Sequence, residues 1–269
     1  MTALSRRLGI FAKTFPRATP AEVAAEVAAA GYAVAHWNFA AINLPTLADG
    51  IPDTTFEAVR TAFGDVKISI PSISATYNTI HPDPESRAEE TRQAVNLIRR
   101  AHLLGADVVI LCTGTRDPYD KWTAHPDNTS PAAWHDLRAT LDVLLDAASD
   151  SAITLAIEPE HGNVVRDAPT AARLLDELGD DAPMGIVFDM ANLLTSDTLD
   201  QQERILTEAV ELLGPRIASI HAKDFDVLDY DLVFHLLRNF TSVPIIVQDV
   251  TESAAAAVRQ DLLRHERQH

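Results

Sequence analysis

The sequence ITLAIEPEH (residues 153–161) is the most informative stretch of this 269-residue chain. It begins as a run of apolar and β-branched residues and ends in Glu158, Pro159, Glu160 and His161. A strand that is apolar along its whole length is typical of a parallel sheet covered by helices on both faces. Because the acidic residues come where this strand leaves the core, we expect its C-terminal end to open into a functional site.

Three later apolar runs also end in a side chain whose oxygen or nitrogen can bind a metal ion. They are GIVFD ending in Asp189, IASIH ending in His221, and IIVQ ending in Gln248. Four strands that end alike predict that one edge of the sheet is polar while the rest is apolar. We therefore expect the site at that edge.

Short β-branched runs alternate with longer runs of helical period along the whole chain, and this βαβα order predicts a parallel sheet. The expected strands span residues 8–14, 32–38, 67–74, 108–112, 153–161, 185–189, 217–221 and 244–250. The expected helices span residues 19–31, 53–63, 84–104, 132–148, 170–178, 199–213, 231–238 and 252–265. A (β/α)8 TIM barrel has about this size, so we predict an α/β fold with one barrel domain over residues 1–269. A doubly wound sheet is the alternative, but no GxGxxG turn follows the first strand.

In a TIM barrel the active site lies at the C-terminal ends of the strands. There, Glu158, Asp189 and His221 come from three successive strands. Two carboxylates and an imidazole predict a divalent metal site for Mn, Mg, Co or Zn. Gln248 is in line as a fourth, neutral and weaker ligand. The alternative is that hydrogen bonds hold these polar residues without a metal.

Five motifs together make the chain similar to a known family. They are IEPEHGNVV (157–165), FDMANLL (188–194), IHAKDF (220–225), YNTIHPDPESR (77–87) and CTGTRDPYDKW (112–122). The chain resembles the xylose isomerase-like superfamily of sugar phosphate isomerases and epimerases. The resemblance implies one divalent metal bound by Glu, Asp, His and Glu. In this chain these positions are Glu158, Asp189, His221 and, in place of the last Glu, Gln248.

The glutamine at position 248 departs from the family pattern. Epimerases of the family use two metal-linked glutamates, one on each face of the reacting carbon, and a glutamine cannot act as a base. A one-base isomerisation through an enediolate remains open, with Glu158 or Glu160 as the base and Lys223 stabilising the enediolate. The alternatives are a sugar-binding or partner subunit that has lost the chemistry, and a metal-dependent polyol lyase or dehydratase. Strand alternation predicts that Asp249 points away from the barrel.

Other polar residues near the strand ends are candidates for binding substrate. They are His36, Asn38, Asn78, His81, Arg116, Trp122 and Asn192. His36 and Asn38 are equally compatible with capping the next turn, and Trp122, in the longest loop, with packing on the barrel rim. In the segment HPDP, Asp83 and Pro84 instead predict the start of a helix. Cys112 is expected to be a buried core thiol.

The amino-acid composition limits the kinds of binding partner that we expect for this chain. The formal charge of −17, from 22 basic and 39 acidic residues, argues against a nucleic-acid-binding surface. No apolar run approaches the roughly 20 residues that span a bilayer, and the N-terminus does not resemble a signal peptide. We therefore expect a cytoplasmic protein, and the family resemblance implies an enzyme that acts on a small sugar or polyol. Because many relatives form dimers or tetramers, a homo-oligomer is also expected.

Overall fold

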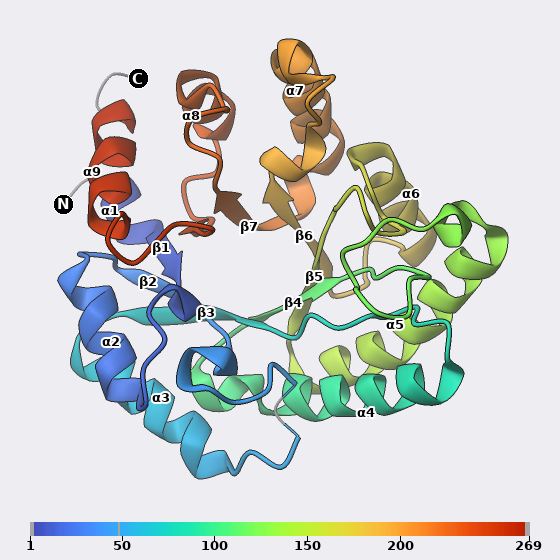
Figure 1. The fold of residues 1–269 in the computed structure, drawn as a ribbon, viewed down its shortest axis with the longest axis horizontal. Coiled ribbons are helices and arrows are strands. Elements are labelled where there is room, and N and C mark those ends of the chain that lie inside the picture. The colour runs from blue at the N-terminus through green and yellow to red at the C-terminus, as the bar shows by residue number, and fades with distance from the viewer. Residues whose placement is uncertain (1–2, 48, 267–269) are drawn as a thin grey trace.

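The computed structural model describes residues 3–47 and 49–266, and its eight parallel strands form a closed barrel in chain order (Figure 1). The strands are β1 Leu8–Phe11, β2 Val34–Trp37, β3 Ser69–Ser74, β4 Val108–Cys112, β5 Thr154–Glu158, β6 Met184–Asp189, β7 Ile217–Ala222 and β8 Ile245–Val247. Pairing of β1 with β8 closes the barrel. The predicted (β/α)8 TIM barrel is confirmed.

Helices surround the barrel (Figure 1). They are α1 Ala3–Arg7, α2 Pro20–Ala29, α3 Asp53–Asp65, α4 Pro84–Arg100, α5 Pro131–Ser151, α6 Ala168–Leu178, α7 Gln202–Leu213, α8 Tyr230–Leu237 and α9 Ala255–Glu266. The helix α1 was not expected from the sequence. None of the helices in the described part of the chain is long and apolar enough to cross a membrane.

Two helices begin at the residues that the sequence indicates. Thr19 caps α2 in a capping box with Glu22, and Pro20 takes the first helical position. The carboxylate of Asp83 accepts from the backbone amides of Glu85 and Ser86 at the start of α4. These local bonds satisfy amide groups that a helix N-terminus otherwise leaves unpaired.

The strand boundaries differ from the prediction mainly at the C-terminal ends. The strand β1 ends at Phe11, and residues Ala12–Thr14 form a 3-10 turn instead. The strand β5 ends at Glu158, so Glu160 lies in the following turn rather than on the strand. After Glu158 the next residue is Pro159, which has no amide hydrogen to donate to the ladder, so β5 ends before Glu160.

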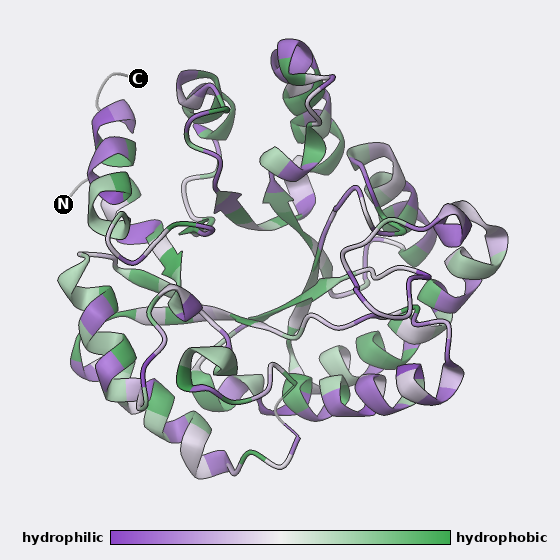
Figure 2. Cartoon of the chain, in the orientation of Figure 1, coloured by the Kyte–Doolittle hydropathy of each residue, from purple (hydrophilic) through white to green (hydrophobic). Residues whose placement is uncertain are grey.

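Buried apolar side chains from the strands and helices form one large core cluster. Figure 2 shows that hydrophobic residues predominate in the strands and alternate with hydrophilic residues along the helices. Within the barrel, Ile110, Ala156 and Val187 pack together from three adjacent strands. The register continues this stacking to the polar end, where Cys112 pairs with Glu158 and Asp189 pairs with His221. The ladder itself therefore brings the acidic strand ends and the imidazole side by side.

Candidate active site

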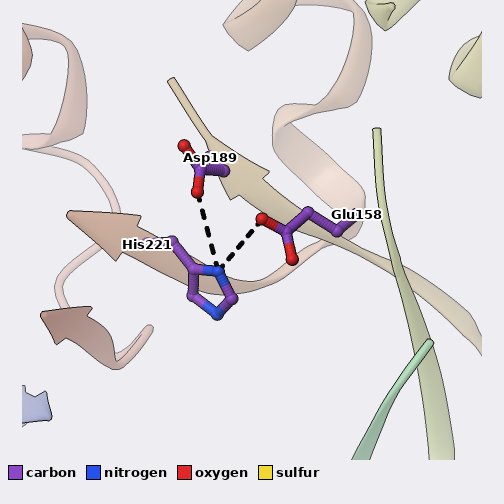
Figure 3. A group of neighbouring side chains, drawn as sticks. All are labelled: Glu158, Asp189 and His221. Carbon is purple, nitrogen blue, oxygen red and sulfur yellow. Dashed lines mark hydrogen bonds and ion pairs between the residues drawn. The ribbon is translucent and has the colours of Figure 1, made fainter. Parts of the chain in front are cut away.

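Glu158, Asp189 and His221 form a compact group at the ends of β5, β6 and β7 (Figure 3). Their ligand atoms all lie within 4.8 Å of one another. The imidazole Nδ1 of His221 lies 3.3 Å from Oε1 of Glu158 and 3.8 Å from Oδ2 of Asp189. All three side chains are largely buried, so their charges interact with little screening by water.

Both carboxylate oxygens of Asp189 accept hydrogen bonds. Oδ1 accepts from the backbone amides of Ala191 and Asn192, at 3.1 and 3.3 Å. Oδ2 accepts from the side-chain amide of Gln248 at 2.9 Å and lies 3.1 Å from the ammonium of Lys223. Gln248 therefore faces this cluster as a hydrogen-bond donor to Asp189, and its role as a fourth metal ligand stays a prediction.

Asn192 connects the two sides of the cluster. Its Nδ2 donates to Oε1 of Glu158 at 2.8 Å, and its Oδ1 accepts from the ammonium of Lys223 at 2.7 Å. A single amide thus fixes the position of one carboxylate and one cation. Sequence reasoning assigned Asn192 to substrate binding but did not anticipate this bridge.

The two carboxylates of the cluster differ in their pKa. Burial alone would raise the pKa of Glu158, but the nearby His221 and Lys223 outweigh burial and lower it. Burial and the negative charge of Glu158 raise the pKa of Asp189 to about 7. Two like charges this close in a buried site oppose each other, so the group as a whole favours additional positive charge.

The bases of the cluster hold their protons more strongly than usual. Burial would lower the pKa of His221, but Glu158 and Asp189 raise it. Burial would likewise lower the pKa of Lys223, and the same two carboxylates, Asp189 first, raise it. The ammonium of Lys223 is therefore a permanent positive charge at this end of the barrel.

The residues present fit a divalent cation. The donor set is two carboxylates and an imidazole, which suits Mn, Mg, Co or Zn. Burial and the charge of Glu158 raise the pKa of Asp189, so a cation between the two carboxylates would stabilise their charged forms. The imidazole of His221 faces both carboxylates through Nδ1, so this nitrogen would be the ligand atom.

A cavity of about 280 Å³ opens above this cluster. Glu158, Glu160, His221, Lys223 and Gln248 all line it. The carboxylate of Glu160 is half-buried and makes no hydrogen bond to any residue that the structure describes. Burial, followed by the charge of Glu158, raises the pKa of Glu160.

Asp249 also lines the cavity, and its carboxylate lies 3.8 Å from the ammonium of Lys223. The prediction that it points away from the barrel is wrong. The strand β8 ends at Val247, and Asp249 has a left-handed backbone with φ of 56°. Strand alternation therefore no longer applies at this position.

His36 and Asn38 reach the same cavity from the end of β2. Nδ1 of His36 lies 2.8 Å from the hydroxyl of Ser72. Burial, together with the neighbouring His221, lowers the pKa of His36 to about 3, so this imidazole is neutral. Oδ1 of Asn38 accepts from the amide of Ala40, so Asn38 caps the turn that follows β2 as well as facing the cavity.

The four candidates from the long loops are distributed differently. Trp122 lines the 280 Å³ cavity, whereas Asn78 and His81 line a neighbouring one. Arg116 lines neither cavity described here; its guanidinium binds the carboxylate of Asp136 and the carbonyl oxygen of Ile80. A substrate-binding role for these four residues stays a prediction.

The cavity is also lined by Phe11, Lys13, Ser74, Thr76 and Ile110. Lys13 lies over the ring of Phe11, with Nζ 4.4 Å from the ring centroid. From the sequence, Lys13 is a basic candidate for binding a substrate phosphate, and Ser74 and Thr76 fall at the end of the third expected strand. Phe11 and Ile110 were not expected there because they are apolar, and only their place along β1 and β4 could have identified them.

Comparison with known proteins agrees with this geometry. The sequence model described as "Xylose isomerase-like TIM barrel" matches residues 24–247. This chain belongs to the xylose isomerase-like TIM barrel family. The resemblance seen in the sequence motifs is thereby confirmed. No curated protein matches the chain by sequence.

Members of the family with solved structures share the fold at low sequence identity. The 3-keto-D-glucoside 4-epimerase from E. coli is 15% identical, with a TM-score of 0.77, over 96% of this chain and 99% of that one. An L-ribulose 3-epimerase is 13% identical, with a TM-score of 0.76, over 97% and 95%. A xylose isomerase-like TIM barrel protein from Mycobacterium smegmatis, in complex with magnesium, is 18% identical, with a TM-score of 0.72, over 99% and 98%. At this identity the likeness shows the fold alone.

Proposed function

We propose that this chain is a metal-dependent isomerase or epimerase of a small sugar, keto-sugar or sugar phosphate. The observation that carries the proposal is the group of Glu158, Asp189 and His221 at the floor of a cavity that also contains Glu160 and Lys223. Two of the structural relatives are named as sugar epimerases, and another was solved with magnesium. These names support the reaction class for this chain.

Glu158, Asp189 and His221 would hold the metal ion. A divalent ion at this place supplies positive charge that lowers the pKa of a carbon-bound proton between two substrate oxygens. Asn192 holds Glu158 in position, and Lys223 places an ammonium next to Asp189. That ammonium would stabilise the oxyanion of the enediolate, since a preorganised charge in a buried site costs little reorganisation.

Glu160 is the better candidate for the proton acceptor. An oxygen of Glu158 accepts from Asn192 and faces the imidazole of His221. The carboxylate of Glu160 lines the same cavity and has no hydrogen bond to the described residues, so it is free to reach a substrate proton. General bases act at hydrogen-bond distance from the proton that they remove.

Gln248 favours isomerisation over epimerisation. Epimerisation by proton transfer needs an acid and a base on opposite faces of one carbon, and the amide of Gln248 can be neither. A single carboxylate can remove a proton and return it to the adjacent carbon on the same face. Asp249 is the other carboxylate at this end of β8, but its side chain is 60% exposed and lies 3.8 Å from the ammonium of Lys223. With Glu160 as the base, the conversion of an aldose to a ketose is the reaction that these side chains support best.

Solvent isotope exchange tests the proposal. The protein with Mn²⁺ would be incubated in D₂O with a panel of ketoses and aldoses, and incorporation of deuterium next to the carbonyl would be followed by NMR. We expect exchange on at least one sugar, with formation of its isomer. Exchange on none of them would contradict the proposal and favour a sugar-binding or partner subunit, while loss of water from the substrate would favour a dehydratase. Cytoplasmic location, self-association and the absence of a nucleic-acid partner also stay predictions.

A further inference from the structure

A second cavity lies beside the first and is the larger of the two, at about 510 Å³ compared with 280 Å³. Thr76 and Trp122 line both cavities and so form the wall that they share. The proposed reaction at the strand ends uses only the smaller cavity. The second therefore has room for a part of the ligand that does not react.

The shared wall is fixed in place by buried contacts. Nδ2 of Asn163 donates to the carbonyl oxygen of Lys121 at 2.9 Å, and Oδ1 of Asn163 accepts from the amide of Gly114 at 2.8 Å. Gly162 packs so closely on this segment that a Cβ atom there would overlap the carbonyl oxygen of Trp122. The loop that contains Trp122 is thus a preformed wall, which reduces the entropy lost when a ligand binds.

The polar groups of the second cavity are suited to hydroxyl groups rather than to an anion. The carboxylate of Glu90 is half-buried there and makes no hydrogen bond within the described chain, and its burial raises its pKa. The cationic group of Lys121 already donates to the carbonyl oxygen of Thr76, and the imidazole of His81 lies 3.2 Å from the carbonyl oxygen of Pro118. Glu90 offers an unpaired acceptor, and the ammonium of Lys121 has N–H donors beyond the one that Thr76 accepts, so the cavity suits a neutral ligand whose O–H groups both donate and accept.

Two aromatic rings complete the cavity. The side chain of Trp122 is 43% exposed and that of Tyr119 is 95% exposed. Both rings line the second cavity, where they offer a ligand an apolar face with a polar N–H or O–H group at its edge. The apolar face of a pyranose ring packs well on an aromatic ring, while its hydroxyl groups reach polar neighbours.

We propose that the second cavity binds a second, uncharged sugar ring, so that the substrate is a glycoside. The reacting sugar occupies the 280 Å³ cavity above Glu158, and the attached ring occupies the 510 Å³ cavity between Trp122 and Glu90. This assignment rests on the proposed isomerase function only for the statement that the first ring reacts. Binding of the second ring is independent of that chemistry.

Calorimetric measurement of the affinity for glycosyl ketoses tests whether the second cavity binds a sugar ring. Four such disaccharides contain fructose with a second sugar, attached to O4 in lactulose and maltulose, to O3 in turanose and to O6 in isomaltulose, so free fructose is the matched reference. We expect at least one of them to bind about 10-fold more tightly than fructose, with or without Mn²⁺. Glu90→Ala should remove most of this advantage, about 10-fold, because a hydrogen bond to a charged group is lost, while the affinity for fructose stays the same.

Glu89→Ala is the matched control. Glu89 precedes Glu90 on α4, but its carboxylate is exposed and pairs with Arg92 outside the cavity. This variant should bind every sugar as the wild type does. Trp122→Ala should weaken the disaccharide and also fructose, because Trp122 lines both cavities. Thermal melting would confirm that all three variants are folded.

The outcomes separate the two proposals. If no disaccharide binds more tightly than fructose, or if Glu90→Ala weakens fructose and the disaccharide equally, the second-ring site is refuted even when fructose exchanges deuterium. If a disaccharide binds with the expected dependence on Glu90 but no sugar exchanges deuterium, the second-ring site stands and the isomerase proposal fails.

Discussion

The ends of β5, β6 and β7 differ sharply from the end of β8. The first three provide two carboxylates and an imidazole within 4.8 Å, with the ammonium of Lys223 alongside. The end of β8 provides a neutral amide, Gln248, that donates to Asp189. One side of the barrel mouth thus holds a buried charged cluster, whereas the other meets this cluster through a neutral amide and carries its own carboxylate, Asp249, in a more exposed place 3.8 Å from the ammonium of Lys223.

This difference between the strand ends determines where in the cavity a side chain can accept or donate a proton. A carboxylate at the end of β8 would place a second acid or base across the cavity from β5, whereas an amide there cannot exchange a proton. Asp249 supplies the other carboxylate at this end of β8, but its side chain is 60% exposed and lies 3.8 Å from the ammonium of Lys223. We therefore assign proton transfer to the β5 side, where Glu160 lines the cavity and is free of hydrogen bonds to the described chain. Substitutions and one chemical modification at the strand ends test this contrast between the two sides of the barrel mouth.

Glu160→Gln should have the largest effect. Removing the proposed proton acceptor is expected to slow deuterium exchange by about 10²–10⁴-fold, the usual contribution of general base catalysis. Metal affinity should stay unchanged, because Glu160 lies outside the group that would bind the ion. Exchange at the wild-type rate would show that Glu160 is not the base.

Gln248→Glu tests the neutral side of the contrast. The change removes a donor from Asp189 and puts a third carboxylate beside Glu158 and Asp189. We expect the free energy of unfolding at neutral pH to fall by about 2 kcal/mol without metal, and excess Mn²⁺ to restore it, since a ligand of the folded state stabilises that state. Urea unfolding with and without Mn²⁺ measures both. A variant as stable as the wild type without metal would mean that the bond to Asp189 contributes nothing.

Asn192→Ala should have a smaller effect. The side-chain amide positions Glu158 and Lys223 without belonging to the proposed ligand set. Loss of such a supporting residue typically reduces metal affinity or activity by about 10–100-fold. Asn192→Asp is a useful partner variant, since it keeps the acceptor for Lys223 but loses the donor to Glu158. Equal losses in both variants would assign the effect to the Glu158 contact.

Treatment with a thiol reagent should have no effect on Cys112 in the folded protein. Its thiol is buried at the end of β4 and donates to the carbonyl oxygen of Tyr77. Burial raises the pKa of this thiol to about 12, so almost no thiolate is present at neutral pH. Iodoacetamide should leave the folded protein unmodified by mass spectrometry and alkylate it only after unfolding. Rapid modification of the native protein would contradict the burial of this end of β4.

Much of the fold follows from the sequence because its signals are local. The alternation of β-branched and helical runs determines the barrel, and the helix caps at Thr19 and Asp83 depend on residues three positions apart or fewer. The proposed metal-binding group can be predicted with one further rule, that the C-terminal ends of parallel barrel strands lie on the same side. Glu158, Asp189 and His221 needed no knowledge of side-chain packing.

The contacts between distant loops could not be derived in this way. Arg116 was expected near substrate, but the carboxylate that binds it belongs to Asp136, on the next helix. Asp249 faces the cavity because β8 is only three residues long and its backbone then turns left-handed. The second cavity arises where three loops meet, and no single stretch of sequence contains a sign of it.

The number of metal ions bound per chain tests the proposed metal centre most directly. Purified protein would be incubated in turn with Mn²⁺, Co²⁺, Mg²⁺ and Zn²⁺, freed of excess ion, and analysed for bound metal beside the Asp189→Ala variant. We expect the wild-type protein to bind one ion per chain for at least one metal, and the Asp189→Ala variant to bind none. No stoichiometric binding by the wild-type protein, or equal binding by the variant, would contradict the assignment of Glu158, Asp189 and His221 as a metal centre.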